Sequence, residues 1–266
     1  MDFELILVEV TDGLAVLTLN QPAIHNGLDE HVCLEIMTAL DQLILRDDVR
    51  ALILTGAGKS FCAGAKLGDP AKLAGSDASF GQRGAQMMEE RYNAVVLALQ
   101  RFPFPIVAAL NGAAAGAGIS LALAADIVLA ARSAYLLAPF LPRLGLVPDM
   151  GATWYLPQHV GRARAMGLML LGDRLPAEKA VDWGLIWSCV DDEALMHEAR
   201  SIAHRLAKAP AHSALESRRA LDTAAEQSLA AQLDYEKERQ RELLDLPSFQ
   251  EGLQAFLEKR EPIFKR

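Results

Sequence analysis

The sequence predicts an α/β layered fold in which buried parallel strands alternate with helices. Apolar segments of strand length alternate with segments of helical spacing up to about residue 190. Beyond that residue, the pattern is typical of successive amphipathic helices. Hydrophobic residues make up 52% of the 266 residues, which is enough for a sizeable core and argues against global disorder.

The first predicted element is a β-hairpin. Two apolar runs flank Asp12 and Gly13, a dipeptide that accepts the positive φ angles of a tight turn. Residues 28–45 then show helical spacing, with Asp29 as a possible N-cap. Further strands are predicted at 50–56, 105–110 and 126–131, and further helices around 87–100 and at 119–125.

The C-terminal part of the chain is predicted to be helical. Amphipathic segments cover residues 191–210, 213–224, 228–244 and 247–260. We therefore divide the chain into a core at 1–200 and a helical region at 201–266. Such a region either covers its own core or packs on a neighbouring subunit, and the pattern alone leaves both open.

Composition excludes several classes of function. The net charge of −8 argues against nucleic acid or an acidic membrane as a partner. Cys33, Cys62 and Cys189 show neither the spacing of a metal site nor that of a disulfide framework, and the six histidines do not cluster, so we expect no metal. Because the cysteines show no pairing pattern and the N-terminus has no basic region of a signal peptide, we expect a cytoplasmic protein. The uncharged segment 102–125 could span a bilayer, but prolines and glycines divide it into a predicted strand, turn and buried helix.

Two loops of small residues each follow a predicted strand. They read FCAGAKLG at 61–68 and NGAAAGAG at 111–118. Close packing explains either loop alone. Together they could present two backbone N–H groups to one carbonyl oxygen, which is an oxyanion hole. The segment GAGKS at 56–60 lacks the earlier glycine of a P-loop, and no G-x-G-x-x-G supports dinucleotide binding.

A serine hydrolase is an alternative of a different class. Ser120 stands in a near-match to the nucleophile elbow G-x-S-x-G, and Asp149 and His159 follow in the order that a triad requires. The weakness of this hypothesis is the glycine–alanine stretch that separates Ser120 from the preceding strand. An elbow serine sits at a sharp turn directly after its strand.

Several ordered motifs resemble the crotonase superfamily, also called enoyl-CoA hydratase/isomerase. They are SFCAGAKL, NGAAAGAGISLALAADIVLA, GLVPDMGATWYLP and LLGDRLPAEKAVDWGLI, and the similarity runs from the hairpin to EGLQAFLEKREPIFK. The resemblance implies a crotonase-like spiral of ββα units with a C-terminal helical trimerisation region. It also implies a homotrimer or hexamer that binds acyl-CoA, stabilises a thioester enolate and uses no cofactor besides the coenzyme A of its substrate.

The resemblance also implies site residues. The oxyanion donors fall on the backbone N–H groups of Ala65 and Ala117, where the entrance of a helix also favours negative charge. The family often has aspartate where this chain has Lys66. The other residues expected to contact the CoA thioester are Ala63, Lys66, Leu67, Gly68, Phe264 and Lys265. The last two are expected to cap the CoA end of a neighbouring subunit.

The carboxylates decide which reaction is expected. Typical hydratases of the family place one glutamate where this chain has Ser120 and another in the segment equivalent to 136–144, which has no acid here and holds one extra residue near Pro142. Asp149 instead occupies a position that is usually glycine, in an apolar stretch that should raise its pKa and make it a usable base. Asp126, at the start of a strand, is expected to be structural.

One carboxylate over an enolate can remove a proton and return it elsewhere, which favours isomerisation. GLVPD and LLGDRLPAEKAVDWGLIW are most similar to the epoxyphenylacetyl-CoA isomerases of phenylacetate degradation. We therefore expect an isomerase that shifts a double bond or rearranges an epoxyphenylacetyl-CoA. An enoyl-CoA hydratase of fatty-acid or aromatic-acid degradation and a non-catalytic acyl-CoA binder remain alternatives.

Overall fold

A computed structural model describes residues 3–66 and 78–264 of the chain. Its strands are β1 (Ile6–Thr11), β2 (Leu14–Leu19), β3 (Ala51–Gly56), β4 (Ser60–Cys62), β5 (Ile106–Leu110), β6 (Ala113–Ala115), β7 (Ile127–Ala131), β8 (Tyr135–Leu137), β9 (Leu175–Pro176) and β10 (Ser188–Val190). Within the described residues they form two sheets, ordered β1-β2-β3-β5-β7-β10 and β4-β6-β8-β9. The pairs β1–β2 and β8–β9 are antiparallel, and all other neighbours are parallel.

The helices lie between and after these strands. They are α1 (Glu30–Ile44), α2 (Phe80–Met87), α3 (Asn93–Arg101), α4 (Ala117–Leu123), α5 (Ala152–Leu171), α6 (Ala177–Asp182), α7 (Leu195–Ala207), α8 (Ser213–Glu226), α9 (Leu229–Leu243) and α10 (Pro247–Glu258). Short helical turns are η1 (Pro22–Ile24), η3 (Met88–Tyr92), η4 (Phe140–Leu144) and η5 (Asp192–Ala194), and η3 and η4 are π-helical.

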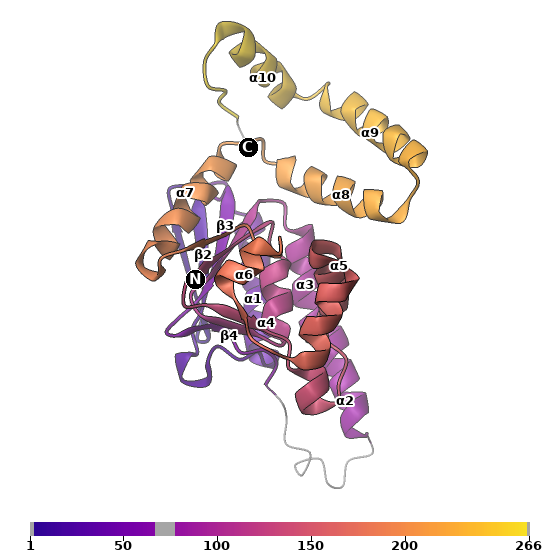
Figure 1. Cartoon of the computed structure of the whole chain (residues 1–266). Helices are drawn as coiled ribbons and strands as arrows, with labels where there is room; N and C mark the ends of the chain where they lie inside the picture. Colours follow the sequence, from indigo (N-terminus) through magenta and orange to yellow (C-terminus); the bar gives the residue numbers. More distant parts are fainter. Residues whose placement is uncertain (1–2, 67–77, 265–266) are drawn as a thin grey trace.

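Three consecutive units repeat one order of elements. They are β3-β4 followed by α2 and α3, β5-β6-α4, and β7-β8-α5. The first strand of each unit lies in the larger sheet and the second in the smaller. The predicted α/β fold with ββα units is therefore confirmed, and Figure 1 shows α3, α4 and α5 together on one side of the strands.

Local signals near the N-terminus predict the observed structure. Asp12 and Gly13 have φ angles of 51° and 80°, as the hairpin turn requires. The Asp29 carboxylate caps α1 by accepting the N–H groups of His31 and Val32, each at 3.1 Å. The uncharged segment 102–125 contains the expected strand, β5, and the expected buried helix, α4, and part of the expected turn forms the short strand β6. Within the described parts of the chain, no helix is both long and apolar enough to cross a membrane.

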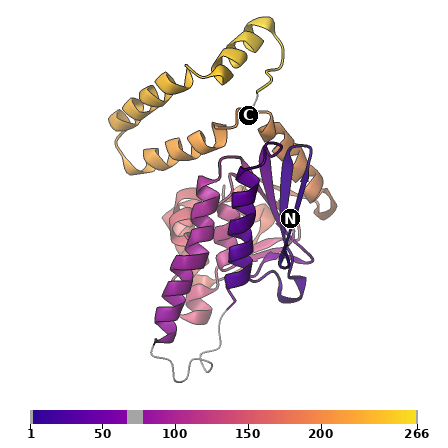
Figure 2. The same ribbon diagram turned by 180° about the vertical axis from the view of Figure 1, so that it is seen from behind.

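The C-terminal helices divide into two groups. Helix α7 crosses residue 200 and packs on β2, β3, β5 and β7 through a buried face of Leu195, Ala199 and Ala203. Helices α8, α9 and α10 instead form an arm that extends from the body, as both views show (Figures 1 and 2). The boundary at residue 200 stays a prediction.

Arg218 joins this arm to the body. Its guanidinium, on α8, forms an ion pair with Asp126 at 2.6 Å and donates to the backbone carbonyls of Phe102 and Phe104. The Asp126 carboxylate also accepts the N–H of Ile106, the first residue of β5, at 2.6 Å. Asp126 is therefore structural, as its position at the start of a strand predicts.

Candidate active site

The first small-residue loop follows β4 and lies against the segment after η1. Leu28 accepts the N–H of Lys66 at 2.7 Å and donates its own N–H to the carbonyl of Gly64 at 2.8 Å. Because neighbouring residues in extended backbone point their N–H groups to opposite sides, the N–H of Ala65 points away from Leu28. Within the described chain, this N–H donates to no acceptor.

The second small-residue loop leads from β6 into α4. Gly116 takes φ 54° and ψ −128°, an angle pair that favours glycine, and its N–H donates to the carbonyl of Leu137 at 2.9 Å. Ala117 is the first residue of α4 and is 1% exposed. Its N–H, like the other first-turn donors of a helix, has no carbonyl within the helix to bond. It donates to no acceptor among the residues that the structure describes.

The two loops meet backbone to backbone. A Cβ atom on Gly64, whose φ is 95°, would lie 2.7 Å from the carbonyl oxygen of Ala115 and 3.1 Å from the nitrogen of Ala117. A Cβ on Gly118 would lie 2.2 Å from the carbonyl oxygen of Cys62. These two positions lack a Cβ because the backbones touch there, so close packing and two N–H groups without an acceptor among the described residues occur at the same place.

Asp149 lies on the loop between η4 and α5. Its Oδ1 atom is buried and has no hydrogen-bond partner among the described residues. Burial raises the pKa of this carboxyl above its ordinary value because the charged form loses water. Gly151 is the N-cap of α5, and no side chain caps that helix. The alternative that Asp149 merely caps the helix therefore has no support in the structure.

One hydrogen bond connects Asp149 to the helix that follows the second loop, and the Asp149 charge affects Tyr92, which bonds to a neighbour of the first loop. Its backbone carbonyl accepts the hydroxyl of Ser120, one turn after Ala117 in α4, at 2.9 Å. Tyr92 donates its hydroxyl to the carbonyl of Leu28, beside Ala65, at 3.2 Å. Burial, and to a smaller extent nearby negative charges that include Asp149, raise the pKa of Tyr92 to about 12.

Sequence reasoning missed Tyr92 and the π-helical turn η3 that carries it. Residues 87–100 have ordinary helical spacing, which gives no sign of a π-turn. The turn η4 has a clearer signal. A π-turn accommodates one inserted residue in a helix, and the resemblance to the family implies one extra residue near Pro142, which lies within η4.

The residues expected along the CoA path are placed only in part. Ala63 and Lys66 are exposed at the rim of the first loop, and the Lys66 ammonium lies 3.6 Å from the Asp29 carboxylate. Leu67, Gly68 and Lys265 lie outside the described residues. Phe264 follows α10, the last helix of the arm, and is far from the two loops in the sequence. Its carbonyl accepts a hydrogen bond from the Arg50 guanidinium at 3.3 Å.

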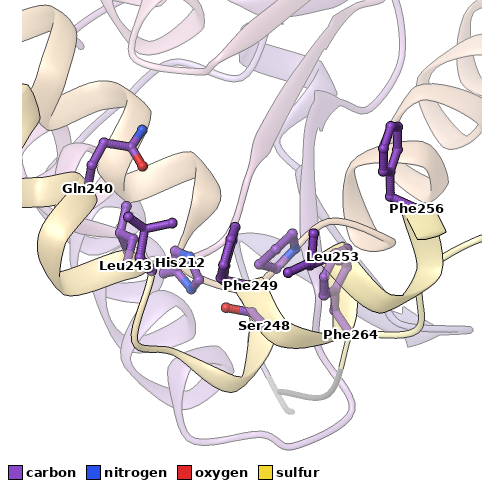
Figure 3. Close-up of a pocket in the computed structure, with 11 residues that line it drawn as sticks. His212, Gln240, Leu243, Ser248, Phe249, Leu253, Phe256 and Phe264 are labelled. Carbon is purple, nitrogen blue, oxygen red and sulfur yellow. The ribbon is translucent and has the colours of Figure 1, made fainter.

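Phe264 lines a hollow of about 440 Å³ within the arm, shown in Figure 3. The same hollow is lined by Pro210, His212, Gln240, Leu243, Leu244, Ser248, Phe249, Gly252, Leu253 and Phe256. None of the residues expected to be catalytic contributes to it. The structure thus does not bring Phe264 to Ala65 or Ala117 within one subunit.

The geometry does not suit a serine hydrolase. Ser120 is fully buried and its hydroxyl donates to a backbone carbonyl, so it is neither exposed nor paired with a base. His159 lines a separate hollow that also contains Asp126 and Trp187. Its pKa is lowered by burial. Within the described residues, no group of three or more histidine, cysteine, aspartate or glutamate side chains could hold a metal ion.

Comparison with known proteins identifies the family. The sequence profile described as enoyl-CoA hydratase/isomerase matches residues 9–266. The chain belongs to the enoyl-CoA hydratase/isomerase family. The resemblance to the crotonase superfamily is thereby confirmed.

Relatives within the family carry both kinds of name. The 1,2-epoxyphenylacetyl-CoA isomerase of Escherichia coli K12 is 43% identical over 262 residues, which cover 98% of each chain. A "Probable enoyl-CoA hydratase" of Rhodobacter capsulatus is 42% identical over 264 residues, which cover 99% of each chain. The crystal structure of an enoyl-CoA hydratase from Polaromonas sp. JS666 has a TM-score of 0.89 at 30% identity, covering 97% of this chain and 99% of that one. Because the isomerase and the probable hydratase are nearly equally identical to this chain, sequence identity does not distinguish the two reactions.

Proposed function

We propose that this enoyl-CoA hydratase/isomerase family member is an acyl-CoA isomerase. In this proposal the N–H groups of Ala65 and Ala117 hold the thioester oxygen, and the Asp149 carboxylate moves a proton. The observation that carries the proposal is the buried Oδ1 atom of Asp149, which has no hydrogen-bond partner in the part of the chain that the structure describes. A buried carboxylate oxygen without a partner is costly for folding, and such costs are concentrated at functional sites.

The proposed steps need one base and two donors. Asp149 takes a proton from the carbon next to the thioester carbonyl of a 3-enoyl-CoA. The electron pair of that C–H bond forms a new carbon–carbon double bond, and the carbonyl π pair moves onto the oxygen to give an enolate. The enolate oxygen accepts hydrogen bonds from Ala65 and Ala117, a type of contact worth about 10²–10³-fold in kcat per donor. Protonated Asp149 then returns the proton to a different carbon, so the double bond moves and no atom is gained or lost.

Hydration of a double bond is the alternative reaction, and the carboxylates disfavour it. Adding water requires groups that position and activate the water molecule. The resemblance implies that the positions of the family's two glutamates are taken here by Ser120 and by the acid-free segment 136–144. Asp126, the remaining acid between Pro105 and Leu171 besides Asp149, is occupied by Arg218. One carboxylate in this region supports proton transfer better than hydration.

A panel of three substrates tests the proposal. Purified protein is assayed with a 3-enoyl-CoA, a 2-enoyl-CoA and an epoxyphenylacetyl-CoA. Isomerisation of the first or rearrangement of the last, at a rate well above hydration of the second, is the expected result. Faster hydration would favour the hydratase, and CoA-ester binding with no turnover of any substrate would favour a non-catalytic acyl-CoA binder. Labelling of Ser120 by a fluorophosphonate would favour the hydrolase.

We also propose that the protein works in the cytoplasm as trimers, or as hexamers made of two trimers. The arm supports this proposal because large apolar side chains on it face water in the single chain: Leu221, Leu229, Phe256, Leu257 and Ile263 are each 71–80% exposed. The three cysteines of the chain are free thiols, which suits a reducing compartment. Light scattering that finds a stable monomer at micromolar concentration would contradict the assembly.

A further inference from the structure

Ser120 makes an unusual contact for a serine inside a helix. Such a serine commonly donates its hydroxyl to the carbonyl four residues earlier in the same helix. Ser120, in α4 and fully buried, donates instead to the carbonyl of Asp149 at 2.9 Å, in a segment 29 residues further along the chain. The side chain therefore connects two separate parts of the candidate site.

The backbone that Ser120 contacts is a tight turn. Met150 has a φ of 50° although it is not glycine, and Gly151 follows with a φ of 88°. A left-handed conformation at a residue with a side chain persists only where surrounding contacts hold it. Those contacts are the burial of Met150, which is 2% exposed, and the two hydrogen bonds that the Asp149 carbonyl accepts from Ser120 and from the N–H of Ala152.

The Asp149 carboxylate depends on this backbone for its place. Its Oδ1 atom has no partner among the described residues, so no hydrogen bond at that oxygen fixes the side chain. Ala117 lies on the same buried helical turn as Ser120. A single hydroxyl thus ties the turn that carries the proposed base to the helix that carries a proposed oxyanion donor.

We propose that Ser120 is a positioning residue, which sets the Asp149 carboxylate relative to the N–H of Ala117 by holding the Asp149 carbonyl. The proposal rests on the proposed function of Asp149 as the base. Ser120 itself does not touch the substrate in this role. Its loss should lower the rate of proton transfer while leaving the backbone donors, and hence substrate binding, in place.

The test compares two variants of Ser120 with a control that removes the same kind of bond elsewhere. Ser120→Ala deletes the hydroxyl, and the Asp149 carbonyl keeps its bond from Ala152. Ser120→Thr restores a hydroxyl. Thr55→Val is the control, because the buried Thr55 hydroxyl donates to the backbone carbonyl of Ala109 at 2.8 Å within the larger sheet. All three are compared for thermal stability, kcat, KM and pH profile with a 3-enoyl-CoA.

We expect Ser120→Ala to lower kcat by about 10- to 100-fold with KM nearly unchanged, since a displacement on the order of 1 Å at a reacting group has that effect. The acid limb of its kcat/KM profile should move to lower pH, because water that reaches the loosened carboxylate stabilises its charge. Tyr92, the titratable neighbour that feels the Asp149 charge, stays neutral across this range with its pKa of about 12. Ser120→Thr should recover most of the lost rate.

The control separates positioning from general stability. Thr55→Val should lose stability to a similar extent as Ser120→Ala and keep its kcat. If Ser120→Ala retains kcat and pH profile like the control, or if Ser120→Thr recovers stability but no rate, the positioning role is wrong. The substitution Asp149→Asn distinguishes failure of the base assignment from failure of the positioning role. Should it stay active, the base assignment fails and the role of Ser120 fails with it. Should it be inactive while Ser120→Ala is fully active, only the role of Ser120 fails.

Discussion

Asp149→Asn removes the proposed base and changes little else. Asparagine keeps the size of the side chain and a carbonyl acceptor, but it cannot take the substrate proton. The backbone N–H groups of Ala65 and Ala117 are untouched, so CoA-ester binding should remain within a few-fold of wild type. Loss of a general base typically costs about 10²–10⁴-fold in rate. That range corresponds to about 3–5 kcal/mol of transition-state stabilisation.

The same substitution should stabilise the fold at neutral pH. Burial raises the pKa of Asp149, so between the ordinary aspartate pKa of about 3.9 and the raised value the folded chain binds more protons than the unfolded chain. The free energy of unfolding therefore falls as pH rises through that window. Asparagine does not ionise and avoids this loss. We expect the variant to unfold at higher temperature than wild type at pH 7, with the difference closing as the pH is lowered towards 4.

Two measurements check this prediction. Single-turnover rates on a 3-enoyl-CoA and an epoxyphenylacetyl-CoA give the catalytic effect, and thermal unfolding from pH 4 to pH 8 gives the stability effect. Asp173→Asn, at an exposed aspartate, is the matched control and should change neither quantity. Turnover by Asp149→Asn within threefold of wild type on the preferred substrate would refute the proposed mechanism.

Three further predictions follow from the contacts described above. Gly64→Ala should lower kcat strongly, because its Cβ would meet Ala115 at 2.7 Å and push the two loops apart; wild-type kinetics would contradict this. Arg218→Met should lower the free energy of unfolding by about 1–3 kcal/mol in a urea titration, because the buried carbonyls of Phe102 and Phe104 lose their donor, and Arg218→Lys should lose less. A variant that ends at Pro262 should show a higher KM for acyl-CoA if Phe264 and Lys265 cap the ligand, whereas an unchanged KM removes that role.

Much of this protein follows from local sequence. The Asp12-Gly13 turn, the Asp29 cap, the longer strands β1, β2, β3, β5 and β7 and the C-terminal helices depend on neighbouring residues, so periodicity and turn chemistry predict them. The short strands β4, β6, β8, β9 and β10 and the helices α2, α5 and α6 are not among the predicted elements. The two bare loops and the isolated acid at Asp149 are also visible in the sequence. Those features are sufficient to predict the α/β fold and to propose the chemistry of the site.

Only the tertiary structure decides how these parts meet. That Gly64 lies against Ala115 and Ala117 depends on the parallel alignment of β4 with β6, which no local pattern records. Arg218 reads in the sequence as one charge among many on an amphipathic helix, yet it is 9% exposed and bound to Asp126, 92 residues away. In the sequence, Ser120 is notable only because related hydratases are expected to have glutamate there. Its hydrogen bond to the Asp149 carbonyl depends on the packing of α4 against the loop before α5. The physical reason is that a hydrogen bond between distant segments depends on where the backbone places donor and acceptor, and that placement is a property of the whole packed core.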